Sequence, residues 1–474
     1  MQNISIKQLN KEGLHYEYKK AKGGLPKTFW STYSAFANTD GGYIFLGIEE
    51  DNGKYYPSGL MQEEIDDLKI NMFNLANNKD KVNVNLLSDD NVEIITIDDI
   101  LVLKVYVERC PSELRPVFIN NNIYQGTFRR TNEGDYRCSI EEVNAFIRDA
   151  SNKSLDLEIV ENQEISSLDI ESVNQYKNIF ASLHPSHPFL KESNERFLEF
   201  IGAARLDKNS ELKLTKAGLL MFGYSYRIVY EYSDFFLDYV EIDETKNNRW
   251  VDRVESTSGQ WSGNIFSFFT IVVNKLIKDI KKPFETKGIY RDDDDEITQM
   301  IREALCNALC NADYYISGGV VIKKYPSYIR FNNPGTLMMD IDMMLRGGTS
   351  LPRNKTLLKM FNLINIGERA GSGVPLIYSV SRDKNLPKPV FEENYNPNRT
   401  TLTIFLEAIK NDDKMTPLEE NIISFLQNNG ISSAKEISSY LNKNITTIKT
   451  TLYKLVDLGI VHTSGTIKDK KYFL

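Results

Sequence analysis

Residues 301–315 read I-R-E-A-L-C-N-A-L-C-N-A-D-Y-Y, and this stretch decides the fold of the middle of the chain. Its apolar residues recur at every third or fourth position, which predicts one amphipathic helix with a buried stripe. Glu303, Asn307 and Asn311 recur every fourth residue on another face, and we call them the Glu/Asn ladder. Their oxygens suit a hydrated Mg²⁺ held against phosphates. The alternative is a partly buried helix with incidental asparagines.

The spacing E-x-x-x-N-x-x-x-N resembles the N-box helix of the gyrase, histidine-kinase and heat-shock-chaperone (GHKL) class of ATP-binding domains. More closely, R-E-A-L-x-N-A-L-x-N-A-D-Y resembles a divergent version found in bacterial proteins labelled transcriptional regulators. Two later stretches agree, I-R-F-N-N-P-G at 329–335 and G-E-R-A-G-S-G-V-P at 367–375. The first lacks the aspartate that reads the adenine amino group in that class. The resemblance implies ATP as cofactor, held by Glu303, Asn307, Asn311, Asn333, Gly335, Gly371 and Gly373, with Asn307 also at the metal.

Composition bounds the possible functions. The chain has 474 residues, 41% of them hydrophobic and 26% charged, which predicts two to four globular domains. A net charge of −8 excludes a uniformly basic surface, so any contact with nucleic acid must come from local patches. The sequence begins without an apolar signal core and has no run long enough to span a bilayer. We therefore expect a cytoplasmic protein with no membrane contact and four reduced cysteines.

Residues 1–150 predict a domain in which a strand near 14–19 places Glu17 and Lys19 on one face. The stretch F-A-N-T-D-G-G-Y-I-F-L-G-I-E-E at 36–50 is preceded by E-x-x-x-x-E-Y-K and followed by Y-x-G-x-F-R-R-T. This pattern resembles the Alba-like, Schlafen-type α/β domain, whose members bind nucleic acid and in some cases cut RNA with three carboxylates and a metal. The resemblance places Glu12 and Glu17 at the first two acidic positions.

The resemblance places the third carboxylate just after the G-I dipeptide, at Glu49 or Glu50, with Asp51 close by. The implied catalytic set is Glu12, Glu17, Lys19 and Glu49, and Mg²⁺ or Mn²⁺ would be held by Glu12, Glu17, Glu49 and Asp51. Arg129 and Arg130 are candidate phosphate contacts. The competing interpretation is a solvated strand face with ordinary charges.

Further boundaries follow from composition and periodicity. We predict a polar linker at 151–185, a GHKL-like α/β sandwich with helices on one face of a mixed sheet at 186–410, and three helices with a hairpin at 416–474. The last segment resembles a winged helix-turn-helix, whose third helix would present Thr447, Lys449 and Lys454 to DNA. A winged helix that serves only protein contacts is the alternative.

The chain is thus expected to be an α+β multidomain protein with three readings of its function. The first is a nucleotide-responsive nucleic-acid-binding protein, an ATP-binding transcriptional regulator that forms homo-oligomers and binds DNA or RNA. The second is a Schlafen-like, metal-dependent ribonuclease, cutting tRNA or other RNA in stress or phage defence, which the other domains regulate. The third is a scaffold whose central fold has lost its ligand.

Overall fold

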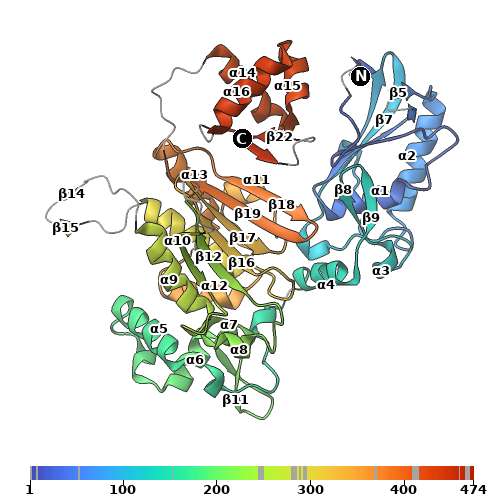
Figure 1. Ribbon diagram of the computed structural model, residues 1–474. Helices are drawn as coiled ribbons and strands as arrows, with labels where there is room; N and C mark the ends of the chain where they lie inside the picture. The colour runs from blue at the N-terminus through green and yellow to red at the C-terminus, as the bar shows by residue number, and fades with distance from the viewer. Residues whose placement is uncertain are drawn as a thin grey trace. The chain divides into compact units, whose positions relative to one another are not determined.

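A computed structural model describes the chain except for residues 1–2, 7–8, 52–53, 152, 244–249, 279–285, 288–289, 292–295, 368–370, 408–415, 458–459 and 465–469. It is a mixed α+β, multidomain protein that divides into two compact units. The first comprises residues 1–380 and 390–403, and the second comprises 381–389 and 404–474 (Figure 1).

The N-terminal part of the first unit is built on a five-stranded sheet of order β1-β6-β7-β3-β2. The β1/β6 and β2/β3 pairs are parallel and the other pairs are antiparallel. Helices α1 (Phe29–Asn38) and α2 (Gln62–Ala76) bury Trp30, Phe36 and Ile65 in its main core. The strands are β1 (Asn3–Ile4), β2 (Tyr16–Lys19), β3 (Gly42–Leu46), β6 (Val92–Ile97) and β7 (Ile100–Val107).

Two hairpins and two helices complete this part. Helix α4 begins where Ser139 and Glu142 form a reciprocal capping box that satisfies two backbone amides. The hairpins place the acidic β4 and the arginine-bearing β8 near strand β2. These elements are β4 (Ile48–Asp51), β5 (Lys54–Pro57), α3 (Ile123–Gly126), β8 (Phe128–Thr131), β9 (Gly134–Arg137) and α4 (Ile140–Asp149).

The segment predicted as a linker, 151–185, is folded over most of its length. It contains α5 (Ile170–Leu183), which buries Tyr176 and Phe180 because its apolar residues recur at helical spacing. Small helices and a hairpin follow it. They are α6 (Asn194–Ile201), β10 (Ala204–Leu206), β11 (Leu212–Leu214), α7 (Lys216–Phe222) and α8 (Ser225–Ile228).

The middle of the chain forms a six-stranded mixed sheet of order β13-β12-β16-β17-β19-β18, in which β12 and β16 pair in parallel, whereas β12/β13, β16/β17 and β18/β19 pair antiparallel. Helices α9 and α10 pack on each other and on this sheet (Figure 1). The strands are β12 (Leu237–Glu241), β13 (Asp252–Glu255), β16 (Val320–Lys324), β17 (Tyr328–Pro334), β18 (Val390–Tyr395) and β19 (Asn398–Phe405), and the helices are α9 (Ile265–Ile277), α10 (Glu296–Asn311), α11 (Ile341–Arg346), α12 (Lys355–Leu363) and α13 (Gly373–Asp383).

Helix α10 carries the Glu/Asn ladder, and its bounds differ from the predicted 301–315. It starts earlier and ends at Asn311, because the chain then turns to join strand β17 through a hydrogen bond from Asp313 N to Pro334 O, 2.9 Å long. The predicted apolar stripe, from Ile301 to Ala312, is buried throughout. Cys306 and Cys310 are buried as well, with 3.9 Å between their sulfurs.

The second unit has the predicted order of three helices and a hairpin. Strand β20 (Ser432–Ser433), which the sequence did not indicate, pairs with β22 and makes a three-stranded sheet. Ile437, Ile448 and Leu452 lie at the centre of its core. The other elements are α14 (Pro417–Asn429), α15 (Ala434–Leu441), α16 (Ile445–Asp457), β21 (His462–Ser464) and β22 (Lys471–Phe473). Across the described residues, none of the helices combines the length and the apolar character that a bilayer crossing requires.

Candidate nucleotide site and carboxylate cluster

The Glu/Asn ladder is internally bonded. Asn307 Nδ2 donates to Glu303 Oε1 at 3.1 Å, and Asn311 Nδ2 donates to the Asn307 carbonyl oxygen at 3.0 Å. These bonds use the amide nitrogens of both asparagines and one carboxylate oxygen of Glu303. Glu303 is 6% exposed, whereas both asparagines are half-buried. The ladder therefore presents acceptor oxygens in a row, as a hard cation requires.

A cavity of about 110 Å³, which we call the ladder cavity, lies against all three ladder residues. Asn333 from β17 and Gly371 and Gly373 at the start of α13 line it as well. The structure thus brings together six of the seven residues that the sequence predicted around a nucleotide. The seventh, Gly335, does not line the cavity. Its positive φ of 95° and missing side chain leave room for the Arg353 guanidinium instead.

Position 373 requires glycine because Glu303 of the ladder lies directly against it. A Cβ atom at this position would lie 1.9 Å from Glu303 Oε1, so any side chain would displace the carboxylate. Val374, the next residue of α13, also lines the cavity. The N-terminus of this helix, with its partial positive charge, therefore faces the same space as the ladder. Residues 368–370 of the predicted glycine-rich turn lie outside the described residues.

Residues 336–352, here the cover segment, close the ladder cavity. Leu337, Met338, Met339 and Leu351 are among its lining residues. A pocket for a drug-sized ligand usually measures about 300–1,000 Å³, so the ladder cavity is too small for a nucleotide as it stands. The cover segment must shift before a nucleotide can enter.

Charged contacts tie the cover segment to the N-terminal part of the first unit. Arg109 donates to the Leu337 carbonyl at 2.9 Å and forms a buried pair with Glu393, which in turn accepts from Leu337 N at 2.6 Å. Arg353 follows the segment directly. It binds both carboxylate oxygens of Asp149 on α4, at 2.7 and 2.8 Å, and also donates to the carbonyls of Thr336 and Asn311. Movement of the cover segment would therefore disturb the contacts to Asp149 on α4 and to Arg109, which follows β7.

Sequence reasoning missed this ion-pair network. Arg109, Asp149 and Glu393 are far apart in the sequence, and no local spacing relates them.

The second predicted site is a carboxylate cluster in the N-terminal part. Glu12 Oε1 accepts from Tyr18 N at 3.0 Å, and Glu12 N donates to the Tyr55 hydroxyl at 2.9 Å. Burial raises the pKa of the Glu12 carboxyl above its ordinary 4.5, and the nearby carboxylates Glu17 and Glu50 raise it further. Such a shift at a group of neighbouring carboxylates is typical of functional sites.

Glu17 is held by cations of the same chain. Lys19 Nζ lies 2.7 Å from one of its oxygens, as the shared strand face predicted, and Arg130 Nη2 lies 2.8 Å from the other. Arg130 is 1% exposed and also pairs with Asp135 at 2.8 Å. The prediction that Arg130 contacts phosphate does not fit this burial. Its guanidinium joins β2 to β8 from the inside.

Glu50, rather than Glu49, lies on the side of the β4/β5 hairpin that faces Glu12. In the β4/β5 hairpin Glu50 is the cross-strand partner of Tyr55, the residue that bonds Glu12, and partners of this kind share a face. Glu49 and Asp51 alternate to the opposite face, where Glu49 pairs with Lys20 at 2.8 Å. We therefore replace Glu49 and Asp51 by Glu50 in the predicted set.

The predicted metal site is not preformed in the described part of the chain, where no three His, Cys, Asp or Glu side chains lie close enough together to hold one ion. The cations at Glu17 explain why, since they neutralise the central carboxylate. Mg²⁺ or Mn²⁺ at Glu12, Glu17 and Glu50 would require Lys19 or Arg130 to withdraw.

The remaining nucleic-acid candidates lie on two surfaces. Arg129 on β8 is mostly buried and pairs with Glu142 at 2.7 Å. Thr447 and Lys449 are exposed on α16, on the opposite side from the buried Ile448. The side chain of Lys454 lies outside the described residues.

Comparison with known families agrees with part of this picture. A model described as Schlafen, AlbA_2 matches residues 12–139, and one of the HATPase class described as ATP-dependent DNA helicase recG C-terminal matches residues 318–404. A domain family of unknown function (DUF8451) matches residues 144–238. The N-terminus is thus a Schlafen/AlbA_2 domain, and the last strands of the middle sheet belong to a recG-like HATPase-type domain. The ladder helix precedes that match, whereas Asn333, Gly371 and Gly373 lie within it.

Among curated proteins, nothing matches the chain. Among solved structures, the chain is similar to the DIP2311 protein from Corynebacterium diphtheriae, with 14% identity and a TM-score of 0.42, over 97% of this chain and 95% of that one.

Proposed function

We propose that this chain is a nucleic-acid-binding protein whose affinity for nucleic acid changes when a nucleotide binds at the Glu/Asn ladder. We further propose that it acts as an ATP-binding transcriptional regulator. One observation carries the proposal. Residues from α10, β17 and the start of α13, widely separated in the sequence, converge on one cavity. Acceptor oxygens on one side and a helix N-terminus on the other are what a Mg²⁺-nucleotide needs.

We infer that the cover segment links nucleotide binding to the nucleic-acid-binding domain. A nucleotide enlarges the ladder cavity by displacing Leu337 and Met338, and Leu337 is bonded to Arg109 at its carbonyl. Arg353 at the end of the segment holds Asp149 of α4. Occupation of the cavity therefore strains the contacts that fix the Schlafen/AlbA_2 domain, which gives the two sites a coupling free energy.

Two regions would bind nucleic acid. The Schlafen/AlbA_2 domain supplies one. In the second unit, the exposed face of α16 with Thr447 and Lys449 supplies the other, as the recognition helix of a winged helix does. Because many DNA-binding regulators read paired half-sites, a homo-oligomer fits this arrangement.

The test measures nucleic-acid affinity with and without nucleotide. Fluorescence anisotropy of labelled duplex DNA and hairpin RNA should show an affinity change of about fivefold or more when ATP and Mg²⁺ are added. Asn307→Ala should abolish this change and leave nucleotide-free binding intact. Asn209→Ala, at an exposed turn, is the matched control and should respond as the unaltered chain does. A response that persists in Asn307→Ala would contradict the proposal.

A second candidate function is metal-dependent RNA cleavage at Glu12, Glu17 and Glu50. The placement of Glu17 and Glu50 beside Glu12 favours it, because their charges add to burial, the main cause, in raising the pKa of the Glu12 carboxyl. A divalent ion would relieve that repulsion and activate water for attack on a phosphodiester.

Glu50→Gln tests this candidate without disturbing the fold, since Glu50 is exposed whereas Glu17 anchors Arg130. Mn²⁺-dependent cleavage of tRNA that the unaltered chain shows and Glu50→Gln loses would support cleavage. The absence of cleavage by the unaltered chain would exclude RNA cleavage. Equal cleavage by Glu50→Gln and Glu49→Gln would exclude it at this site.

A further inference from the structure

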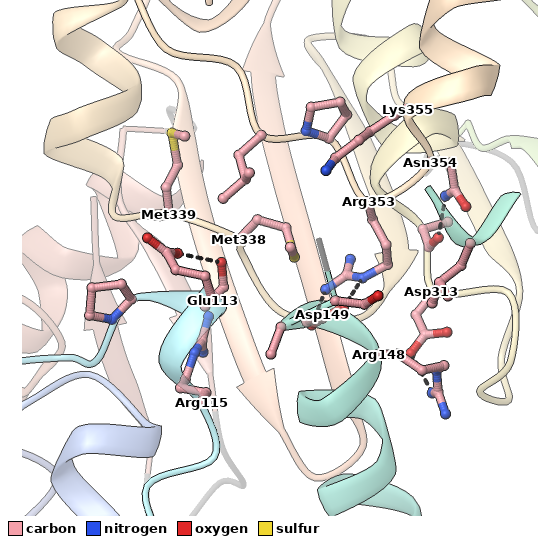
Figure 2. A pocket seen from close by; sticks show the side chains of 18 of the residues that line it. Glu113, Arg115, Arg148, Asp149, Asp313, Met338, Met339, Arg353, Asn354 and Lys355 are labelled. Atoms are coloured by element: carbon pink, nitrogen blue, oxygen red, sulfur yellow. Dashed lines mark hydrogen bonds and ion pairs between the residues drawn. The ribbon is translucent and has the colours of Figure 1, made fainter. Parts of the chain in front are cut away.

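A second cavity, of about 390 Å³, lies on the other side of the cover segment, and we call it the arginine pocket. Its wall combines residues from the end of the Schlafen/AlbA_2 domain, from α4 and from 312–355 (Figure 2). Met338, Met339 and Leu351 line both cavities. This volume lies within the range of small-molecule sites, unlike that of the ladder cavity.

Arg115 distinguishes this pocket. It lines the cavity and is 3% exposed. Its Nε and Nη1 atoms are buried and have no hydrogen-bond partner within the described part of the chain. Its one polar contact is long, from Nη2 to the Leu337 carbonyl at 3.4 Å, and its guanidinium also lies 5.7 Å from the ring of Phe146. No carboxylate of the described residues forms an ion pair with it.

The other arginines of the pocket are compensated. Arg353 holds Asp149, Arg148 holds Asp313 at 2.8 Å, and Arg109 holds Glu393, as the dashed lines of Figure 2 show for the first two. Burial lowers the pKa of Arg115 and the nearby charge of Arg109 lowers it further, while Asp149 and Glu393 offset part of this without pairing with Arg115. A guanidinium does not release its proton in proteins, so the charge stays. A buried cation left without a partner is costly, and such a group persists where a ligand completes it.

We propose that the arginine pocket binds a small organic molecule through an oxyanion, a phosphate or a carboxylate, that pairs with Arg115. An oxyanion can accept two parallel hydrogen bonds from the two terminal nitrogens of one guanidinium. In Arg115, Nη1 is without a partner among the described residues and Nη2 makes only the long bond to Leu337, while Nε is an unused donor on another side of the group. Arg148 Nε, which is also buried and without a hydrogen-bond partner, is a further donor in the same wall.

The other lining residues of the arginine pocket indicate what the uncharged part of the ligand is. Met338, Met339 and Met343, with Tyr232 and Pro352, give the pocket a mainly apolar surface that can adapt to a flat ring. Lys153 and Lys355 line it as exposed residues, so a second negative group near solvent is tolerated. An aromatic or heterocyclic acid or phosphate fits these features.

Isothermal titration calorimetry of the full chain with phenyl phosphate, benzoate and phenol tests the proposal. We expect saturable binding of at least one of the two anions, and the stronger of them identifies the oxyanion. Phenol, which lacks the charge, should bind at least tenfold more weakly. Arg115→Met should weaken anion binding at least tenfold, and Arg196→Met, at an exposed helix position, should leave it unchanged.

Melting temperature gives a second readout. Without a probe, Arg115→Met should melt no lower than the unaltered chain, because the substitution removes an unpaired buried charge. A fall of several degrees would assign Arg115 to the fold and overturn the proposal. Equal anion binding in Arg115→Met, or no binding of either anion to the unaltered chain, would overturn it as well.

Two further variants separate this pocket from the ladder cavity and from folding defects. Met343→Glu places a carboxylate at a residue that is 48% exposed, so the chain should fold and lose anion binding through repulsion. Unchanged anion binding in this variant would count against the site. Asn307→Ala should keep anion binding whether or not it loses ATP, so failure at one cavity is distinguishable from failure at the other.

Discussion

The carboxylate cluster of the Schlafen/AlbA_2 domain and the Glu/Asn ladder of the middle domain make an instructive pair. Both are sets of acidic or amide side chains at a spacing that suits a metal ion. In the cluster, Lys19 and Arg130 already occupy both oxygens of Glu17. In the ladder, the side-chain amide nitrogens of Asn307 and Asn311 donate within their own helix, and both residues line a cavity. Residue spacing in the sequence alone predicts such a set. Whether its oxygens can bind a metal ion depends on the cations that folding brings beside them.

The largest effect that would sharpen this comparison comes from Arg130. Arg130→Met leaves Glu17 and Asp135 without their shared partner, each at 14% side-chain exposure. Breaking a buried ion pair from one side costs about 3–5 kcal/mol. Urea unfolding should show a loss of this size, whereas Arg137→Met, at an exposed position of β9, should change the free energy of unfolding by less than about 0.5 kcal/mol. A loss below about 1 kcal/mol for Arg130→Met would mean that the cluster is not closed by this residue.

The next effect is expected at the ladder. Gly373→Ala would bring a Cβ atom to 1.9 Å from Glu303 Oε1 and 2.7 Å from its Cδ, so the carboxylate must move into the cavity. ATP affinity should fall about tenfold or more, which corresponds to about 1.4 kcal/mol. The control is Gly13→Ala, whose Cβ would have one neighbour at 3.9 Å. If both variants bind ATP equally well, the ladder does not face the nucleotide.

A smaller effect is expected from Glu12. Burial raises its pKa above 4.5, so the folded protein holds this proton more tightly than the unfolded chain does. Ionisation of Glu12 therefore costs stability as the pH rises from 4.5 through the folded-state pKa. Glu12→Gln should be more stable than the unaltered chain at pH 7, by less than about 1 kcal/mol because the group is half exposed to screening solvent, and the gain should vanish below pH 4.5. Thermal melts across this pH range measure it, and Glu133→Gln at an exposed turn is the control. If the stability advantage of Glu12→Gln grew as the pH fell, the direction of the proposed pKa shift would be contradicted.

The smallest effect concerns the second unit. Lys449→Gln removes one exposed charge from α16, which should weaken DNA binding about two- to threefold and reduce the dependence of log affinity on log salt by about one unit. Lys435→Gln, exposed on α15, should change neither quantity. Equal effects of the two substitutions would show that α16 is not the face that meets DNA.

Much of the local structure could be predicted from the sequence. The period of the apolar residues indicated the stripe of α10, which the structure buries from Ile301 to Ala312. Six of the residues expected around a nucleotide do share a cavity, because motif spacing fixes which side of an element a residue takes.

What could not be predicted depended on tertiary contacts. Arg130 looked like a surface arginine, and only the packing of β8 beside β2 buries it against Glu17. The choice between Glu49 and Glu50 depended on the hairpin register, which sets the face that each side chain takes. Arg115 gave no sequence signal, because the lack of hydrogen-bond partners for its Nε and Nη1 among the described residues arises only from how the chain folds around it.

Calorimetry of ATP binding in the presence of Mg²⁺ tests the central claim most directly, that the Glu/Asn ladder is a nucleotide site. The unaltered chain should bind one ATP per chain, and Asn307→Ala should bind it at least tenfold more weakly, whereas Asn209→Ala should bind it as the unaltered chain does. Equal ATP affinity for the unaltered chain and Asn307→Ala, or no binding to either, would contradict the account.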